Sequence, residues 1–368
     1  MEEFQINLTN KIIDSLNNNY EPPLDPLFIK YPYKPKKQLG QGNFKDKLTV
    51  NIAGKYYSAK SAAHYAFKRM LELNKELNYF QYCYQLLNDK LSKSILIELV
   101  ALRICGESKV KLMIETEKYL GYHKGAIELK DDNNQLKTKF RNLNLSFFDL
   151  TRSNFDIKTY NTVVGIATIF FHEQYANYEN NIFVEDGDVV IDAGGCWGDT
   201  ALYFYSKNPS GKVYSFEFIP SNIELFEKNL ELNPSHNVQI IKQPLWSENN
   251  LDFYFKDDGP ASQVATIPEN GLDESVKSIT IDMLIQQEKL DSLDFIKMDI
   301  EGAELEALKG AKNSIIKYKP KLAISLYHNP VDFLEIPAFI KELNLGYKFH
   351  LGHAMPNLTE TVLFATVH

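Results

Sequence analysis

The stretch from Val189 to Phe204, VVIDAGGCWGDTALYF, constrains the fold of this chain more than any other. Four residues suited to a buried strand, Val-Val-Ile-Asp, lead into a glycine-rich turn and then into a segment that suits a helix. A strand, a glycine turn and a helix in this order are typical of a nucleotide-binding unit in an α/β protein. The pattern predicts such a unit and leaves open which nucleotide it holds.

Strands and helices alternate from about residue 160 to the C-terminus. Strands are expected in GDVVIDAGG, KVYSFEF, NVQIIKQPLW, LDFIKMDI and KLAISLYH, and two more around a loop near the C-terminus. Helices are expected in DTALYFYSKN, PSNIELFEKNLELN, AELEALKGAKNSIIKY and DFLEIPAFIKELN. The alternation predicts an α/β fold with a doubly wound, mostly parallel, Rossmann-like sheet that binds ligands at the carboxyl ends of its strands.

The first 150 residues follow a different pattern. Residues 57 to about 120 have helical spacing of apolar side chains, and the polar segment from about 121 to 150 is expected to link or edge two parts. The segment GQGNF is best interpreted as a surface loop, because no strand precedes it and no Gly-Lys-Ser/Thr follows it. Since 368 residues exceed one compact core, we expect a mainly helical N-terminal region over residues 1–150 and a nucleotide-binding domain over 151–368. The first region would serve as a lid or as an oligomerisation surface.

Composition narrows the classes of partner. The chain is 44% hydrophobic and 24% charged, with a formal net charge of -8 and a pI near 5.6. An acidic protein is a poor match for nucleic acid or an anionic membrane. Cys83, Cys105 and Cys196 are too widely spaced for a disulfide framework. Because no segment reads as a signal peptide or a membrane span, we expect a cytoplasmic protein with free thiols.

The acids at the strand ends indicate which nucleotide is bound. The turn nearly fits the dinucleotide fingerprint, and Glu217 ends the next strand roughly where such proteins place an acid for the ribose, about 20 residues on. A pyrophosphate, however, would meet the like charge of Asp192. With Asp299 at the end of a further strand, the cleft suits a cation. S-adenosylmethionine carries a sulfonium and an ammonium and no phosphate, so a methyl donor fits better than NAD.

Several pieces of the chain resemble the FkbM-type methyltransferases. They are GDVVIDAGGCWGDTALYF, VYSFEFIPSN, SITID and, most specific of all, DFIKMDIEGAELEALKGA. The resemblance covers roughly residues 160–366 and implies a class I S-adenosylmethionine-dependent O-methyltransferase, of a kind that commonly acts on sugars or glycosylated products. It implies that residues 151–368 form the S-adenosylmethionine-binding methyltransferase domain. Where many members have an asparagine after the second small residue, this chain has GGCWGD.

The predicted donor site combines the resemblance with the residues themselves. Asp192, Gly194 and Gly198 match the family's donor-binding motif, and Glu217 matches its ribose-binding acid. Leu245 and Trp246, in PLWSE, would hold the adenine ring between them. The predicted donor-binding residues are Asp192, Gly194, Gly195, Gly198, Glu217, Phe218, Leu245, Trp246 and Asp299.

The acceptor end is expected at two neighbouring strand tips, MDIEG and SLYHNP. A sugar hydroxyl is a poor nucleophile until it loses its proton, so a base or a metal ion helps. Asp299 and His328 are the predicted catalytic residues, and an ordinary histidine pKa near 6.5 suits a base. By analogy with metal-dependent O-methyltransferases of this fold, Asp299, His328 and Asn329 would hold Mg²⁺ or another divalent cation. Glu301 and His353 are the candidates for acceptor contact.

Two other functions stay open on the sequence alone. An NAD-dependent oxidoreductase or epimerase would need phosphate-compatible charge where Asp192 stands. A non-catalytic glycan-binding module would keep the fold without the chemistry. For the preferred function, the expected partner is a sugar or glycan acceptor, with no nucleic acid and no membrane span, and the N-terminal helical region is the expected surface of a homo-oligomer.

Overall fold

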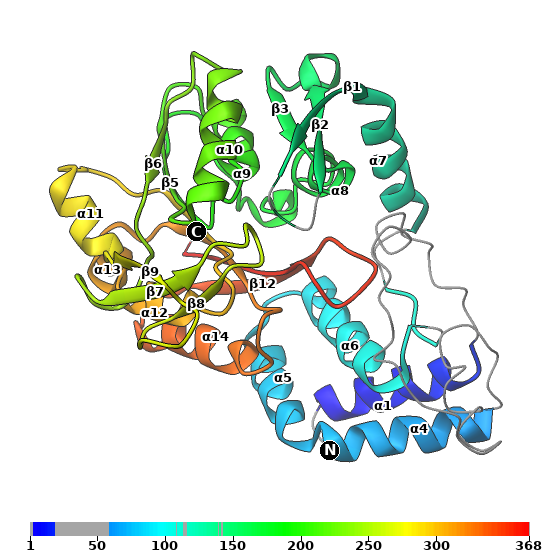
Figure 1. The fold of residues 1–368 in the computed structure, drawn as a ribbon. Helices are drawn as coiled ribbons and strands as arrows, with labels where there is room; N and C mark the ends of the chain where they lie inside the picture. The colour runs from blue at the N-terminus through cyan, green and yellow to red at the C-terminus, as the bar shows by residue number, and fades with distance from the viewer. Residues whose placement is uncertain are drawn as a thin grey trace.

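The computed structural model describes residues 3–18, 59–107, 109–112, 116–138, 140 and 143–367. Its centre is a seven-stranded sheet in the order β12-β13-β11-β10-β4-β5-β6 (Figure 1). The strands are β4 (Val189–Ala193), β5 (Lys212–Phe216), β6 (Val238–Ile241), β10 (Phe295–Met298), β11 (Lys321–Ser325), β12 (Lys348–His353) and β13 (Thr361–Thr366). β13 runs antiparallel to β11 and β12, and the other neighbours are parallel. The predicted α/β fold with a mostly parallel sheet is confirmed.

Both faces of the central sheet are buried, because successive residues of a strand point to opposite sides. Val190 packs in one apolar cluster with Phe204 of the helix that follows β4. Ile191, the next residue, packs in another cluster with Leu284 and Ile315 on the opposite face. The covering helices are α9 (Asp199–Lys207), α10 (Pro220–Glu231), α11 (Ile281–Gln287), α12 (Glu304–Lys309), α13 (Lys312–Tyr318) and α14 (Asp332–Glu342).

One expected helix is divided in two. The segment AELEALKGAKNSIIKY forms α12 and α13 with a break at Gly310 and Ala311. A Cβ atom at Gly310 would lie 2.1 Å from the carbonyl oxygen of Trp246, so the glycine brings the end of α12 against the chain after β6. The helical periodicity was read correctly, but this close approach between backbones ends the first helix.

Two antiparallel sheets flank the central one. The polar segment expected to link or edge the two parts contributes the end of α7 (Thr116–Leu129) and the strands β1 (Lys130–Lys137) and β2 (Asn144–Asp149), which continue to β3 (Lys158–Asn161). The chain between the third and fourth expected strands, in which no strand was predicted, forms β7 (Asp252–Lys256), β8 (Gln263–Ala265) and β9 (Glu274–Lys277). Short turns of helix lie at Leu150–Ser153, Val163–Gly165, Ile166–Phe171 and Tyr178–Asn180.

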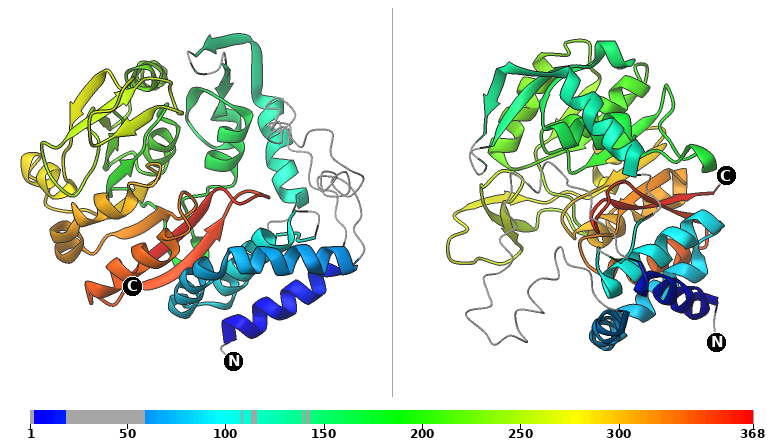
Figure 2. Two further views of the ribbon diagram at one scale, coloured as in Figure 1. Left: turned by 60° about the horizontal axis from the view of Figure 1, so that its bottom comes forward. Right: turned by 90° about the vertical axis from the view of Figure 1, so that its right-hand side faces the viewer.

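The N-terminal helices pack against the β12 end of the central sheet (Figure 2). They are α1 (Glu3–Leu16), α4 (Ala59–Glu72), α5 (Asn74–Leu86) and α6 (Lys90–Cys105). At the start of α6, Asp89 contacts the Nδ1 atom of His350 at 2.7 Å, and the Ser92 hydroxyl accepts the Leu351 N–H at 2.8 Å. These contacts cover the edge strand β12. One apolar cluster runs from the N-terminal helices to the sheet, and the boundary predicted at residues 150/151 falls between β2 and β3, which pair with each other.

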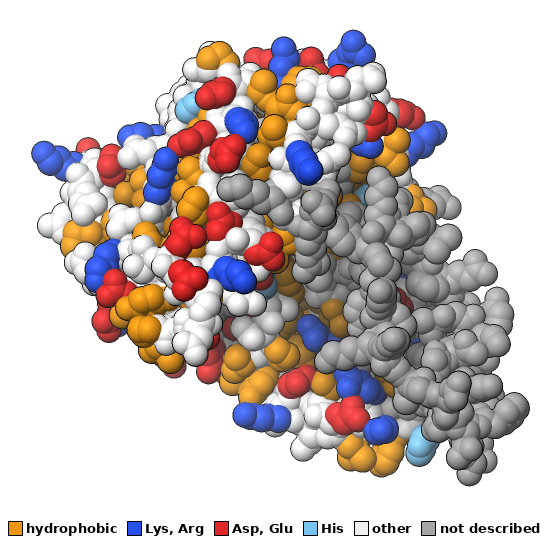
Figure 3. All heavy atoms as spheres, viewed as in Figure 1, with side chains coloured by type: hydrophobic (Ala, Val, Ile, Leu, Met, Phe, Trp, Pro, Cys, Tyr) orange, Lys and Arg blue, Asp and Glu red, His pale blue; other side chains and the backbone are white. Residues whose placement is uncertain are grey.

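The surface and helix lengths bear on the expected partners. On the face in Figure 3, lysine and arginine side chains outside the grey atoms are scattered among acidic and apolar ones. Among the described residues, no helix combines the length and the apolar character needed to cross a membrane. The GQGNF segment lies outside the described residues.

Candidate functional site

A cavity of about 730 Å³ opens at the carboxyl ends of the central strands. Its walls are the turns after β4, β5, β6 and β10, together with the sheet formed by β7 and β8. Ligands of open α/β sheets bind in this position. Of the predicted donor-binding residues, those that line the cavity are Gly194, Glu217, Phe218, Leu245, Trp246 and Asp299.

The glycine turn brings two strand ends into close contact. Gly194 has a φ of 87°, and a Cβ atom there would lie 1.9 Å from the carbonyl oxygen of Asp299. Only glycine fits such an approach without displacing the backbone. Gly195 and Gly198 do not line the cavity, because they face the Ser215 hydroxyl and the Phe226 ring beneath the turn. They shape the turn rather than contact a ligand.

Asp192 lies beneath the turn and not in the cavity. Its carboxylate is fully buried, accepts hydrogen bonds from Thr200 (2.9 Å) and Ser215 (2.7 Å), and pairs with Lys297 at 3.0 Å. Asp192 and Lys297 are register partners on β4 and β10. The expectation that Asp192 presents bare negative charge to a ligand therefore needs correction, since a buried charge of this kind is neutralised by its partner.

Lys297 is a functional residue that the sequence reasoning missed. Its ammonium donates to the carbonyl oxygens of Ala193 (3.0 Å) and Gly194 (2.7 Å) and is 1% exposed. Although burial favours the neutral amine, Asp192 and then Asp299 raise the pKa of Lys297, so it stays charged. This cation holds the glycine turn in shape from below. The sequence contained one indication of this role, because FIKMD has the apolar pattern of a buried strand apart from its lysine, and a buried lysine needs a partner.

Glu217 closes β5 at the cavity wall. One carboxylate oxygen accepts the N–H groups of Phe218 and Ile219 at 2.7 Å each, and the other accepts from the Asn222 amide at 3.1 Å. Burial raises the pKa of Glu217 to about 7. Asn222 also lines the cavity, and its buried side-chain oxygen has no hydrogen-bond partner among the described residues. A buried acid beside an unsatisfied amide oxygen fits the hydroxyl groups of a ribose.

Apolar and aromatic residues form the wall beside Glu217. Leu245 is buried after β6, and the Trp246 ring meets Phe253 edge to face with centroids 5.3 Å apart. Cys196 lines the cavity, whereas the Trp197 side chain packs with Leu145 and Leu225 away from it. Cys196 and Trp197, which belong to the GGCWGD segment that departs from the family pattern, thus have different positions, one in the cavity and one in the core.

Asp299 is held by two tyrosines at the end of β10. The Tyr175 hydroxyl donates to its Oδ2 atom at 2.8 Å, and the Tyr327 hydroxyl donates to its Oδ1 atom at 3.0 Å. Because Asp299 also lines the cavity, its carboxylate is fixed in direction where a ligand would lie. Neither tyrosine was predicted, since nothing in the sequence shows that residues 175 and 327 meet the end of β10.

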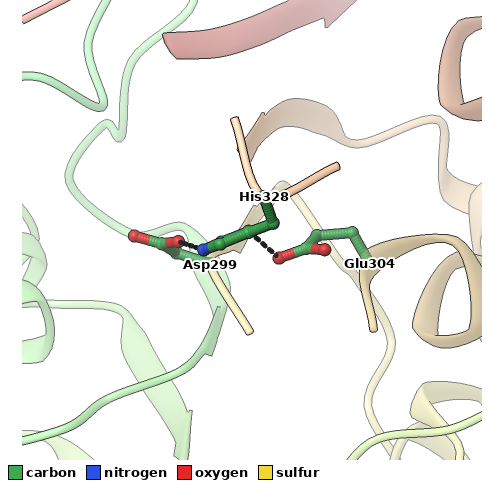
Figure 4. Close-up of side chains that lie close together, drawn as sticks. All are labelled: Asp299, Glu304 and His328. Carbon is green, nitrogen blue, oxygen red and sulfur yellow. Dashed lines mark ion pairs between the residues drawn. The ribbon is translucent and has the colours of Figure 1, made fainter. Parts of the chain in front are cut away.

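His328 lies between two carboxylates (Figure 4). Its Nδ1 atom is 3.1 Å from Glu304, and its Nε2 atom is 3.4 Å from Asp299 and 3.6 Å from Glu301. Burial works to lower the pKa of His328, but Glu304, Asp299 and Glu301 together raise it to about 9. The pKa of His328 therefore departs from the ordinary histidine value that the sequence suggested, because three acids surround the ring.

The predicted metal ligands are only partly brought together. Asp299, Glu304 and His328 each offer a ligand atom, and these atoms lie within 4.8 Å of one another. The two carboxylates approach different nitrogens of the ring, however, whereas a metal ion would use one nitrogen. The Asn329 amide nitrogen lies against Gly302, where a Cβ atom would come within 2.6 Å of it.

The two candidate acceptor contacts differ in position. Glu301 lines the cavity, and its side chain is 82% exposed. His353 does not line it, because its Nδ1 atom lies 2.9 Å from the Thr361 hydroxyl in the β12–β13 hairpin. Burial lowers the pKa of His353 to about 4. Of these two residues, only Glu301 is therefore open to a molecule in the cavity.

Comparisons with known proteins agree with this geometry. Residues 181–349 match the methyltransferase FkbM domain. The chain is similar to Methyltransferase 1 of Beauveria bassiana, 25% identical over 169 residues that span 40% of this chain and 68% of that protein. It is also similar to the hexuronic acid methyltransferase AglP of Haloferax volcanii, 24% identical over 169 residues that span 44% of this chain and 65% of that protein.

A solved structure supports the fold. The crystal structure of methyltransferase FkbM from Methylobacillus flagellatus matches with a TM-score of 0.50 and 19% identity, over 82% of this chain and 62% of that chain. This chain thus spans less than two thirds of that protein and of AglP. The matched domain contains the glycine turn, Glu217, Asp299 and His328.

Proposed function

We propose that this chain, whose residues 181–349 match the methyltransferase FkbM domain, transfers the methyl group of S-adenosylmethionine to a hydroxyl oxygen of a sugar, nucleotide sugar or glycan precursor. The observation that carries the proposal is one cavity in which Gly194, Glu217 and Asp299 meet at the ends of three neighbouring strands. The match of residues 181–349 to the methyltransferase FkbM domain supports methyl transfer over the oxidoreductase alternative.

The residues of the cavity wall fit the parts of the donor. Glu217 and Asn222 would bind the ribose hydroxyls, and Leu245 and Trp246 would flank the adenine. Asp299 would face the donor's cationic end, where its fixed carboxylate attracts positive charge. The bound donor supplies a methyl group on a sulfonium, and the chain supplies alignment and a dry site.

The acceptor proposal rests on the acids and on one relative. AglP is a hexuronic acid methyltransferase by name, which supports a sugar hydroxyl as the atom methylated here. Asp299, Glu301 and His328 supply acceptor groups for such hydroxyls at the reacting end. His328 does not itself line the cavity, but its Nε2 atom lies 3.4 Å from Asp299 and 3.6 Å from Glu301, which do. We take His328 as the general base for a hydroxyl held beside these carboxylates.

A divalent ion such as Mg²⁺ is the second way to activate the hydroxyl, supported by the grouping of Asp299, Glu304 and His328. We prefer the base, because the carboxylates approach different ring nitrogens. Methyl transfer should therefore survive exhaustive dialysis against EDTA. If dialysis abolishes methyl transfer and added Mg²⁺ restores it, a metal ion rather than a base activates the hydroxyl.

The experiment is transfer of labelled methyl from [methyl-³H]S-adenosylmethionine to glucose, glucuronic acid and UDP-glucuronic acid. We expect label in at least one sugar, as an alkali-stable ether, and loss of that label in Glu217→Gln. The matched control is Glu224→Gln, on the exposed side of α10. Label in none of these sugars despite tight donor binding would favour the glycan-binding module, and label released by mild alkali would point to a carboxylate rather than a hydroxyl acceptor.

A further inference from the structure

The turn between β10 and α12 places two acids on opposite sides of one imidazole. Glu301 and Gly302 have positive φ angles of 57° and 96°, which reverse the chain directly after Asp299. Glu304 then points back, and its Oε1 atom accepts the N–H of Ile300 at 2.8 Å. Glu304 is thereby locked to the same turn that carries Asp299. Glycine at 302 leaves room for the tip of β11, because a Cβ atom there would collide with Asn329.

His328 enters this gap from β11. Its side chain is 8% exposed, and its ring lies against the Tyr327 ring at a tilt of 40°, with centroids 4.2 Å apart. Apart from the ion-pair contacts to the three acids, neither ring nitrogen has a hydrogen-bond partner among the described residues. Glu304 is fully buried, and its Oε2 atom also has no partner among them. A buried carboxylate kept here at a cost in desolvation calls for a role beyond stability.

We propose that Glu304 is a positioning residue that holds the Nδ1 atom of His328, so that the Nε2 atom is the one that takes the proton from the acceptor hydroxyl. The inference rests on the proposed function. Glu304 acts through His328 and has no contact with the cavity, since it is absent from the cavity wall. His328 is also absent from that wall, but Asp299 and Glu301, which lie on its Nε2 side, do line it.

The proton and electrons balance in one displacement. The acceptor hydroxyl gives its proton to the Nε2 atom of His328 and an electron pair to the methyl carbon, forming an O–C bond. The carbon–sulfur bond breaks, and its electron pair stays on sulfur, which becomes neutral. The imidazole becomes an imidazolium with Nδ1–H directed at Glu304, whose negative charge stabilises it at 3.1 Å. An acid in this place fixes both the tautomer and the charge of the base.

The test is Glu304→Gln, with Glu306→Gln on the same helix as the matched control. The amide keeps the shape of the side chain but loses its charge and offers N–H groups to Nδ1. We expect kcat for methyl transfer from [methyl-³H]S-adenosylmethionine to the accepting sugar of the panel to fall about 10²- to 10⁴-fold. The KM for the sugar and the affinity for S-adenosylhomocysteine should change less than about twofold. His328→Asn and the double variant should be equally slow, because the two residues act as one unit.

Other outcomes separate the failures. If the wild type binds S-adenosylhomocysteine but labels no sugar, the proposed function fails and this inference falls with it. If the wild type is active and Glu304→Gln keeps its kcat, only the inference is overturned. A variant whose melting temperature and donor affinity fall together with kcat would also overturn it, since Glu304 would then be merely structural. If Glu304→Gln does not fold, Glu304→Asp, which withdraws the same charge by one methylene, should show the same kcat-only loss in smaller degree.

Discussion

Replacing Lys297 by methionine tests how the donor turn is held. The change keeps the length of the side chain and removes the ammonium that bridges Asp192 and the carbonyl oxygens of Ala193 and Gly194. Asp192 keeps its hydrogen bonds from the Thr200 and Ser215 hydroxyls but loses its only ion-pair partner among the described residues. Its charge would then lie buried and uncompensated.

The expected cost follows from that burial. Asp192 and Lys297 are 0% and 1% exposed, so solvent screens the pair very little. Breaking a buried pair by removing one partner costs about 3–5 kcal/mol. At about 2–4 °C per kcal/mol for a domain of ordinary size, the melting temperature should fall by roughly 10 °C. Affinity for S-adenosylhomocysteine should fall as well, because the Gly194 backbone lines the cavity.

Thermal melting and calorimetric titration of the same samples provide the assay. Lys309→Met is the control, since Lys309 pairs with Glu306 on the surface and its loss should cost less than about 1 kcal/mol. The double variant Asp192→Asn/Lys297→Met should lose less stability than the sum of the single variants, because both charges are gone. If Lys297→Met melts and binds like the control, the ammonium does not hold the turn and the reasoning is refuted.

Four further predictions concern the pH dependence of the rate, the pH dependence of stability, donor binding and the turn after β10. Because the pKa of His328 is raised to about 9, the kcat/KM of methyl transfer should rise with pH up to about 9 and then level off. A flat pH profile of kcat/KM would show that His328 is not the base. The same raised pKa means that the charged histidine stabilises the fold fully below about 6.5, and that this contribution is lost as the pH rises through about 9, which melting curves across this range can check. Glu217→Gln should weaken S-adenosylhomocysteine binding by about 1.5–3 kcal/mol, roughly 10- to 150-fold, in isothermal titration, and unchanged affinity would mean that Glu217 does not bind the ribose. Gly302→Ala should lower kcat more than donor affinity, because its Cβ atom would push Asn329 and the neighbouring His328 out of line, and equal effects on both in steady-state kinetics would argue against it.

The fold was predictable because its signals are local. Alternating strand and helix periods, the glycine turn at Gly194 and the acids that end β5 and β10 each depend on a few consecutive residues. Parallel strands place their carboxyl ends along one edge, so Glu217 and Asp299 could be assigned to one cavity from order alone. The strands β7 to β9 were missed, since their short and partly exposed segments carry little periodicity.

The chemistry of the site was less predictable, because it depends on contacts between distant residues. The buried ion pair between Asp192 and Lys297 connects two strands, and the sequence shows neither that these residues pair nor that both are buried. The raised pKa of His328 comes from acids on another turn, and Tyr175 reaches Asp299 from outside the matched domain. Glu304 stood inside the most specific motif, yet its direction became visible only in three dimensions.

The most direct test of the account is calorimetric titration of the ligand-free protein with S-adenosylhomocysteine, beside NADH and beside Glu217→Gln. The account predicts saturable one-site binding of S-adenosylhomocysteine that Glu217→Gln weakens at least tenfold, with no saturable heat from NADH. Saturable binding of NADH with no heat from S-adenosylhomocysteine would contradict it, because the cavity at the ends of β4, β5 and β10 would then hold a dinucleotide instead of a methyl donor.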